Sequence, residues 1–345
     1  MSFMILAELC DKGSSSLAQK DLLFDSGIYP VYGAAGEITK VDFFHQSKPY
    51  LGLIKDGAGV GRVMQLPANS SVIGTIQYLF PRENVDLKYL YYLIKYLDLG
   101  KSNTGATIPH IYFKDYKKRK VKVREYSEQK HIGQILELID SHLSTYKNVL
   151  DQYDLLIKSR FVELFGDVVL NTLNWPLVKL SDIAEYRIGL TYKPEAVSSS
   201  GTAVLRSGNI QNSQLCYEDT IYVDSKVEAK LLLKKHDILM CARNGSQSLV
   251  GKVALIEDDI LNTTYGAFMM AISSKYYVYL FEYFRSQAFR RLISVGSTTT
   301  INQVTTKMLN SVVIPLPDID TVNRFALYHS QINKLKSDVQ KSIDE

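Results

Sequence analysis

The clearest pattern of apolar positions in the chain is a seven-residue repeat near its middle. Apolar residues recur at every seventh position, and a second series precedes most of them by four positions. The first series is Leu136, Leu143, Leu150, Ile157 and Leu164, and the second is Ile132, Ile139, Tyr146 and Tyr153. This spacing is that of a coiled-coil seam, and it predicts one helix over 127–165, about 39 residues and ~60 Å long. Gly166 and Asp167 follow as a plausible stop.

A second periodic segment lies near the carboxyl end. It predicts a helix from about Asp320 with Thr321 as a candidate N-cap, about fifteen residues shorter than the first. Its apolar face holds Phe325, Tyr328, Ile332, Leu335, Val339 and Ile343. A long helix is unstable alone in water and needs a cover for its apolar stripe, so we expect the two helices to pair antiparallel. The alternative is that both are ordinary packing helices.

The regions before each helix have a different pattern. Short apolar runs broken by Gly, Pro, Asn and Ser predict strands, for example at 51–54, 72–76 and 253–256, whereas 89–99 and 276–294 have helical spacing. The fold class expected is therefore mixed α/β. We expect one globular domain at 1–124, a helix at 125–167, a second domain at 168–318 and a second helix at 319–345.

The two halves of the sequence repeat one another. At a shift of 193 residues, Thr107 aligns with Thr300, Val121 with Ile314, and Ile132 with Phe325. At a shift of 190, 61–63 (GRV) meets 251–253 (GKV). One register sustained over about 40 residues predicts a tandem repeat, in which pseudo-twofold symmetry places a domain at each end of the helix pair.

Composition supports this picture without identifying the function. The chain has 345 residues, 46% hydrophobic and 22% charged, which suits two soluble globular domains. Its net charge of +4 permits a polyanionic partner without requiring one. The sequence has neither a run of about 18 apolar residues nor a basic signal-peptide region at its start, so we expect a cytoplasmic protein without a membrane partner. Cys10, Cys216 and Cys241 lie too far apart for a disulfide framework or zinc site, so buried thiols are expected.

Patterns typical of catalysis are missing from the sequence. The segment 57–62 (GAGVGR) matches a phosphate-binding loop only in its glycines, because it lacks the Gly-Lys-Ser/Thr ending. The six histidines are scattered without metal-ligand spacing. No Asn/Asp-Pro-Pro-aromatic tetrapeptide of an adenine methyltransferase occurs. We therefore expect neither catalytic residues nor a metal site in this chain.

Ten short motifs occur in one order along the repeated frame. In the first half they are 31–36 (VYGAAG), 57–62 (GAGVGR), 89–92 (YLYY), 104–111 (TGATIPHI) and 128–132 (EQKHI). In the second half they are 164–167 (LFGD), 174–176 (NWP), 180–183 (LSDI), 206–210 (RSGNI) and 243–246 (RNGS). Together they make the chain resemble, over its whole length, the specificity subunits of type I restriction–modification systems.

The resemblance implies a function without catalysis in this chain. Each of two target-recognition domains would read one half of a bipartite site in double-stranded DNA, and the helices would set the spacer. Two methyltransferase subunits would dock on the helices, and motor–nuclease subunits would join them. The chain itself would bind no cofactor, because S-adenosylmethionine, ATP and Mg²⁺ would be held by the partner subunits.

Candidate DNA contacts fall into three groups. The first is a basic cluster before the first helix, which includes Lys114, Lys117, Lys118 and Arg119 and could grip phosphates or be a solvated face. The second is a pair of polar loops at equivalent positions, whose Asn, Gln and Thr side chains suit base edges. These loops contain Thr104, Thr107 and His110, and Thr298, Thr299, Thr300, Asn302 and Gln303. The alternative is that these loops are polar only because loops generally are.

The third group consists of turns and of basic–aromatic neighbours. Lys55 and the residues Arg243, Asn244 and Gln247 lie in equivalent turns, where the alternative is a turn that simply requires glycine. The remaining candidates are Arg187, Tyr192, Lys193, Arg206 and Asn209.

Two rival functions remain open: a two-lobed coiled-coil scaffold that binds only proteins, and an enzyme with an unrecognised site.

Overall fold

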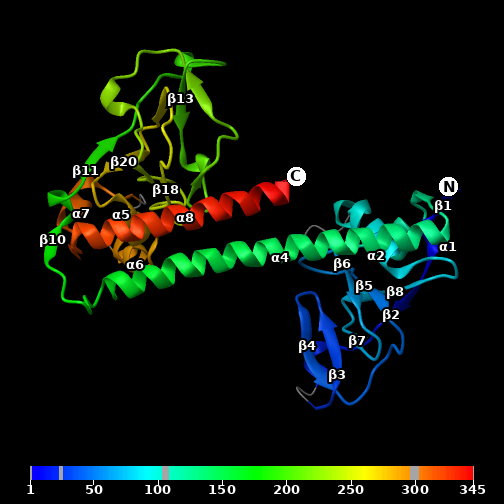
Figure 1. Ribbon diagram of the computed structural model, residues 1–345. Coiled ribbons are helices and arrows are strands. Elements are labelled where there is room, and N and C mark those ends of the chain that lie inside the picture. Colours follow the sequence, from blue (N-terminus) through cyan, green and yellow to red (C-terminus); the bar gives the residue numbers. More distant parts are fainter. Residues whose placement is uncertain (1, 23–25, 103–108, 296–302, 345) are drawn as a thin grey trace. The chain divides into compact units, whose positions relative to one another are not determined.

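The computed structural model describes residues 2–22, 26–102, 109–295 and 303–344 (Figure 1). Contacts divide the chain into two compact units, Met1–Thr145 and Tyr146–Glu345, and the division falls within helix α4 (Tyr126–Phe165). The long helix predicted from the heptads is thus confirmed to within one residue at its start. Among the described residues, no helix is both long and apolar enough to span a membrane.

Unit 1 places a four-stranded sheet of order β2-β8-β5-β6 beside a three-stranded sheet of order β4-β3-β7. A separate ribbon pairs β1 with β9 just before α4 begins. The elements are β1 (Ser2–Ile5), α1 (Leu6–Leu9), β2 (Cys10–Ser14), β3 (Tyr29–Gly33), β4 (Gly36–Val41), β5 (Tyr50–Ile54), β6 (Val63–Leu66), β7 (Ser71–Val72), β8 (Ile76–Pro81), α2 (Leu87–Leu97), α3 (Phe113–Tyr116) and β9 (Lys120–Val123).

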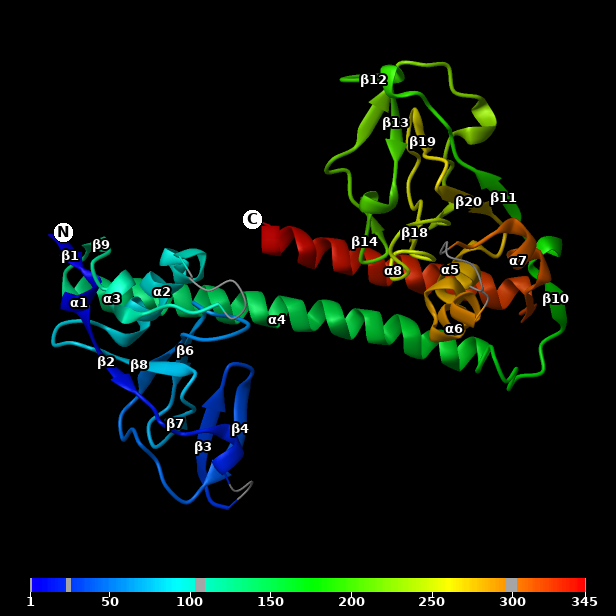
Figure 2. The ribbon, with the colours of Figure 1, turned by 180° about the vertical axis from the view of Figure 1, so that it is seen from behind.

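Unit 2 repeats this plan. Its first sheet has the order β11-β20-β17-β18, its second β12-β16-β13-β19, and its ribbon pairs β10 with β21 before α8. Strands β11 and β20 of the first sheet and β12, β13 and β19 of the second are labelled in Figure 2. The elements are β10 (Leu177–Lys179), β11 (Glu185–Ile188), β12 (Val197–Ser198), β13 (Thr202–Leu205), β14 (Ile210–Gln211), β15 (Gln214–Leu215), β16 (Ile221–Val223), β17 (Ile238–Cys241), β18 (Val253–Leu255), β19 (Thr263–Tyr265), β20 (Met269–Ser273), α5 (Tyr277–Arg285), α6 (Gln287–Val295), α7 (Thr306–Ser311), β21 (Val313–Pro315) and α8 (Ile319–Asp344). The mixed α/β class and the tandem repeat are both confirmed.

Three local expectations need correction. The run 72–76 is not one strand, because it joins the end of β7 to the start of β8 across a turn. The helical segment 276–294 is broken at Ser286 into α5 and α6. The cap of α8 is Asp318 rather than Thr321, because the Asp318 carboxylate accepts hydrogen bonds from both the amide and the hydroxyl of Thr321, each at 2.8 Å.

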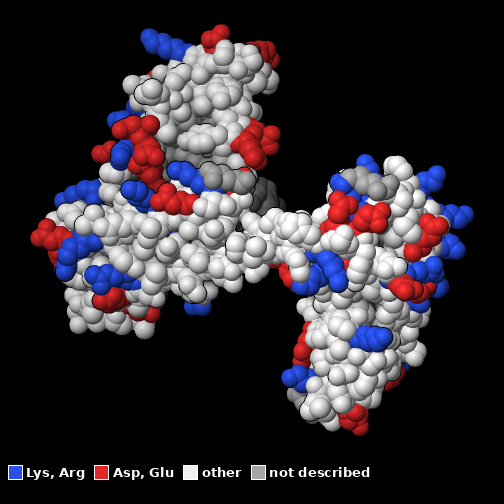
Figure 3. Space-filling model, turned by 45° about the vertical axis from the view of Figure 1, so that its right-hand side comes forward, with Lys and Arg blue, Asp and Glu red and all other residues white. Residues whose placement is uncertain are grey.

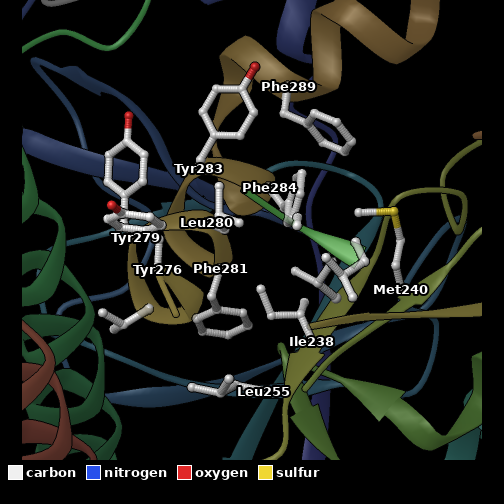
Figure 4. Close-up of a cluster of buried hydrophobic side chains, with 14 of the residues drawn as sticks. Ile238, Met240, Leu255, Tyr276, Tyr279, Leu280, Phe281, Tyr283, Phe284 and Phe289 are labelled. Atoms are coloured by element: carbon white, nitrogen blue, oxygen red, sulfur yellow. The ribbon is translucent and has the colours of Figure 1, made fainter. Parts of the chain in front are cut away.

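The core of unit 2 joins its first sheet to helices α4, α5 and α8. Ile238 and Met240 of β17 face Phe281 and Phe284 of α5 (Figure 4). The ring of Phe325 on α8 lies edge-on to Phe161 and Phe165 of α4, at 5.6 and 5.3 Å between ring centroids. These contacts explain why the apolar stripe of α8 faces inward at this end.

Helices α4 and α8 are antiparallel in unit 2, as the seam predicts. Phe325 contacts Phe161 and Phe165, whereas Lys336, farther along α8, bonds to Asp154, earlier on α4, at 2.7 Å between Nζ and Oδ1. The seam is buried only over part of its length, however. Ile139 on α4 is 48% exposed and Leu335 on α8 is 45% exposed, whereas Ile157 is 1% exposed.

A buried charge network fastens α8 to α5. Glu282 of α5 accepts a hydrogen bond from Arg285 at 2.5 Å and lies 3.4 Å from Nε2 of His329 on α8. The side chains of Glu282 and His329 are 5% and 4% exposed. Burial by itself raises the pKa of Glu282, but the His329 hydrogen bond and the Arg285 charge lower it further than burial raises it. The carboxylate is therefore held in its charged form.

We expect Glu282→Gln to destabilise unit 2 by about 2 kcal/mol at neutral pH, the usual value of a hydrogen bond to a charged group. Because the folded-state pKa is lowered, the stabilisation is present above the unfolded pKa of Glu and is lost as the pH falls through the lowered folded value. The wild-type chain should therefore lose more stability than the variant on acidification. Urea unfolding followed by the fluorescence of Trp175, the single tryptophan, measures the difference.

A matched control is Glu163→Gln, which removes an exposed pair with Arg160 on α4. Its effect should stay below about 0.5 kcal/mol at every pH. Equal pH profiles for wild type and Glu282→Gln would contradict the assignment.

Candidate nucleic-acid interface

The hairpin turns and the polar loops predicted separately come together in each unit. In unit 1, the turn between β5 and β6 meets the loop before α3: Gly57 donates its amide to the carbonyl of Pro109, and Asp56 forms a β-bridge with His110. In unit 2, the turn between β17 and β18 meets the loop before α7 through a β-bridge between Arg243 and Gln303. The fold thus brings segments 54 residues apart in unit 1 and 60 residues apart in unit 2 to the same end of each first sheet.

The two turns are equivalent in backbone geometry. The amide of Gly61 bonds to the carbonyl of Ile54, and the amide of Gly251 bonds to that of Cys241, both at 2.8 Å. Both glycines have positive φ, +87° and +77°. A Cβ on Gly61 would lie 2.1 Å from the amide nitrogen of Gly100, so this turn requires glycine. The glycine-rich segment 57–62 is accordingly a structural hairpin, as its missing phosphate-loop ending indicates.

In unit 2, several candidate side chains share this end of the sheet. Arg243 and Gln247 are exposed. The side-chain amide Nδ2 of Asn244 donates to Oγ of Ser207 at 3.1 Å. Gln247 and Gln303 line a cavity of about 450 Å³ together with Val250 and Arg290. Amide groups that line a partly apolar cavity suit hydrogen bonding to base edges beside apolar contact.

Two candidates have structural roles instead. Asn209 is 2% exposed; its Oδ1 accepts from the amide of Arg206, and its Nδ2 donates to the carbonyl of Cys216. Arg187 donates to Asp237 at 2.5 Å and to the carbonyl of Lys230 at 2.8 Å, and its side chain is 18% exposed. Their polar groups are occupied within unit 2, which removes the basis for reading them as DNA contacts.

The remaining candidates of unit 2 lie at its surface. Arg206 is exposed and donates to the carbonyl of Asp219 at 3.0 Å. Lys193 is exposed and Tyr192 half-buried, in the segment that follows β11. Lys193 and Tyr192 are therefore accessible to a ligand, whereas the guanidinium of Arg206 is partly occupied by its bond to Asp219.

In unit 1, basic and aromatic side chains alternate after the loop. The rings of His110 and Tyr112 meet edge-on at 4.6 Å, and Nζ of Lys114 lies 5.0 Å from the centroid of the Tyr112 ring. Tyr112 is 49% exposed and was not among the residues singled out from sequence, although its alternation with His110 and Lys114 was visible there. Exposed rings beside lysines can contact sugars and bases while the lysines contact phosphates.

The other basic candidates of unit 1 differ from one another in exposure and in the partners of their side chains. Lys118 is exposed and Lys117 half-buried, while Arg119 donates to the carbonyl of Leu97 at 3.4 Å. Lys55 lies 3.4 Å from the carboxylate of Asp56. On the face shown in Figure 3, acidic and basic side chains are interspersed over both units, with no continuous basic surface.

Six candidates lie outside the described residues: Thr104, Thr107, Thr298, Thr299, Thr300 and Asn302. Within the described ranges, no three His, Cys, Asp or Glu side chains gather in a way that could hold a metal ion.

Comparison with known proteins gives one consistent result. The family model "Type I restriction modification DNA specificity domain" matches residues 1–152 and 173–342. The type I restriction enzyme MjaVIII specificity subunit of Methanocaldococcus jannaschii is 22% identical over 311 residues, which are 82% of this chain and 72% of that protein. The StySPI specificity subunit of Salmonella potsdam is 25% identical over 154 residues, 42% of this chain and 33% of that one. The crystal structure of a type I restriction–modification S subunit from M. genitalium matches 99% of this chain and 94% of its own, with a TM-score of 0.65 at 18% identity.

Proposed function

The chain belongs to the family of type I restriction modification DNA specificity domains, and we propose that it selects the DNA sequence on which a restriction–modification complex acts. Each unit binds one half of a bipartite site in double-stranded DNA. The observation that carries this proposal is the repeated pairing of a hairpin turn with a polar loop at one end of the first sheet of both units. Two equivalent polar surfaces in one chain suit two half-sites.

The proposal extends to the complex. The chain is non-catalytic and binds no cofactor. Two methyltransferase subunits that hold S-adenosylmethionine dock on α4 and α8, and motor–nuclease subunits that use ATP and Mg²⁺ join them. The length of α4 contributes to the spacer between half-sites. This division of labour suits a chain whose sequence lacks the methyltransferase tetrapeptide and a complete phosphate loop.

A selection experiment tests this function. The full chain, with and without its methyltransferase partner, is incubated with a random duplex library at two salt concentrations, and bound duplexes are sequenced. We expect two short motifs at a fixed separation, with overall affinity falling as salt rises. Replacing 174–318 by the same region of another family member should change one motif and leave the other intact.

The rival scaffold, which binds only proteins, predicts no enriched motif and no salt-dependent retention of DNA. A change in both motifs after the exchange would show that the two units do not read independently.

A further inference from the structure

One arginine at the candidate nucleic-acid interface of unit 2 differs from neighbouring arginines in the contacts of its guanidinium group. Arg243 is exposed, and the centre of its guanidinium group lies 5.6 Å from the ring centroid of Phe268. Within the part of the chain that the structure describes, its guanidinium group makes no hydrogen bond or ion pair. By contrast, Arg206 donates to the carbonyl of Asp219, and Arg290 donates to that of Val250 at 2.6 Å. Within the described ranges, the guanidinium donors of Arg243 are therefore left for a ligand.

The ring beneath this arginine is itself exposed, and its backbone is hydrogen-bonded to that of Arg243. Phe268 is 62% exposed, in the turn just before β20. Its carbonyl accepts hydrogen bonds from the amides of Ala242 and Arg243, at 2.9 and 3.0 Å. Because Arg243 follows β17 and Phe268 immediately precedes the paired strand β20, the backbone bonds keep the two residues adjacent, and the cation–π contact restricts where the guanidinium points. What distinguishes Phe268 from the other exposed apolar side chains is its contact with Arg243, because an exposed ring beside a guanidinium can touch a base or sugar while the guanidinium donates to a base edge.

Unit 1 has different chemistry at the same backbone positions. The amide of Lys55 donates to the carbonyl of Thr75 at 3.0 Å, as the amide of Ala242 donates to that of Phe268. Asp56 makes the β-bridge that corresponds to the one made by Arg243. The arginine and its ring are thus replaced by a carboxylate and an exposed threonine.

We propose that Arg243, which packs on the ring of Phe268, reads a guanine in the half-site bound by unit 2, and that Asp56 at the equivalent position of unit 1 does not, so the two half-sites differ at this position. The inference rests on the proposed function. A guanidinium fork donates two hydrogen bonds to O6 and N7 of guanine in the major groove. A carboxylate at the equivalent place accepts hydrogen bonds and cannot read those two acceptors. The ring supplies an apolar surface against the neighbouring base or sugar.

The test compares motifs selected from a random duplex library by the full wild-type chain and by Arg243→Ala. We expect the variant to lose preference at one guanine by about 10- to 100-fold, in the half-site that changes when 174–318 is exchanged. The other half-site should be unchanged. Phe268→Ala should weaken the same preference, and Arg324→Ala, which removes an exposed arginine on α8, should leave both motifs intact.

A chemical probe covers the case in which Arg243→Ala abolishes binding altogether. Duplexes carrying 7-deazaguanine, which lacks the N7 acceptor, at that position should bind the wild-type chain at least several-fold more weakly. Unchanged wild-type affinity for this duplex, an unchanged motif in Arg243→Ala, or a unit 2 half-site without guanine would each overturn the inference. Failure of the wild-type chain to select any split motif would instead refute the proposed function.

Discussion

Phe325→Ala is expected to lower the free energy of unfolding of unit 2 by about 4 kcal/mol, within the usual range for a buried phenylalanine cut to alanine. Phe325 is fully buried, and its ring contacts both Phe161 and Phe165 of α4. Phe161 in turn stacks on Tyr279 of α5. The substitution leaves a cavity where three helices meet, and their surrounding backbone can only partly collapse into it.

Urea unfolding followed by Trp175 fluorescence measures this effect, because the single tryptophan lies in unit 2 and reports on that unit. Leu327→Ala is the matched control. Leu327 lies two residues along the same helix and is 64% exposed, so its loss should cost well under 1 kcal/mol. Similar losses in both variants would contradict the place given to Phe325 in the core.

The sequence predicted the architecture well because the architecture depends on periodicity. Heptad spacing located α4 to within one residue, and the shift of 193 residues anticipated that β9 and β21 are equivalent strands. The strand at 72–76 was wrong because the apolar run is continuous across a turn, where Gly74 and Thr75 separate two sheets. Apolar composition alone cannot show where a chain leaves one sheet for the next.

For the candidate site, the sequence gives residue types but not their surroundings. The type of a residue shows which hydrogen bonds its side chain can make. It does not show whether neighbouring groups in the fold already use those donors and acceptors. Asn209 and Arg187 have suitable chemistry, yet their hydrogen bonds lie within unit 2. Phe268 was missed because an aromatic residue between strands resembles a core residue until its exposure is known. The sequence showed that the turns and the loops occupy equivalent positions in the two halves. Only the tertiary fold shows that turn and loop meet within each unit.

Inserting one heptad after Thr145, between Ser141 and Leu156, is expected to change the preferred spacer while leaving both half-site sequences unchanged. Seven residues lengthen a helix by about 10.5 Å and add nearly two full turns. Side chains beyond the insertion therefore rotate by only about 20° about the helix axis relative to those before it. At 3.4 Å per base pair, the preferred spacer should grow by about 3 base pairs. Lys95 bonds to Asp140 and Lys336 to Asp154, so the insertion preserves the packing of both units.

The measurement is selection from the same random duplex library, followed by titration of duplexes with spacers of graded length. On the original site, affinity should fall toward nonspecific binding, a loss of about a thousandfold or more, because only one half-site can then be engaged correctly. A control that replaces Ser144 and Thr145 by alanine, without changing the length, should keep the original spacer, since both side chains are exposed on α4.

If the insertion altered the half-site sequences and not the distance between them, α4 would contribute to base reading and not to spacing. An unchanged spacer would mean that the separation of the half-sites is set by partner subunits and not by the length of this helix.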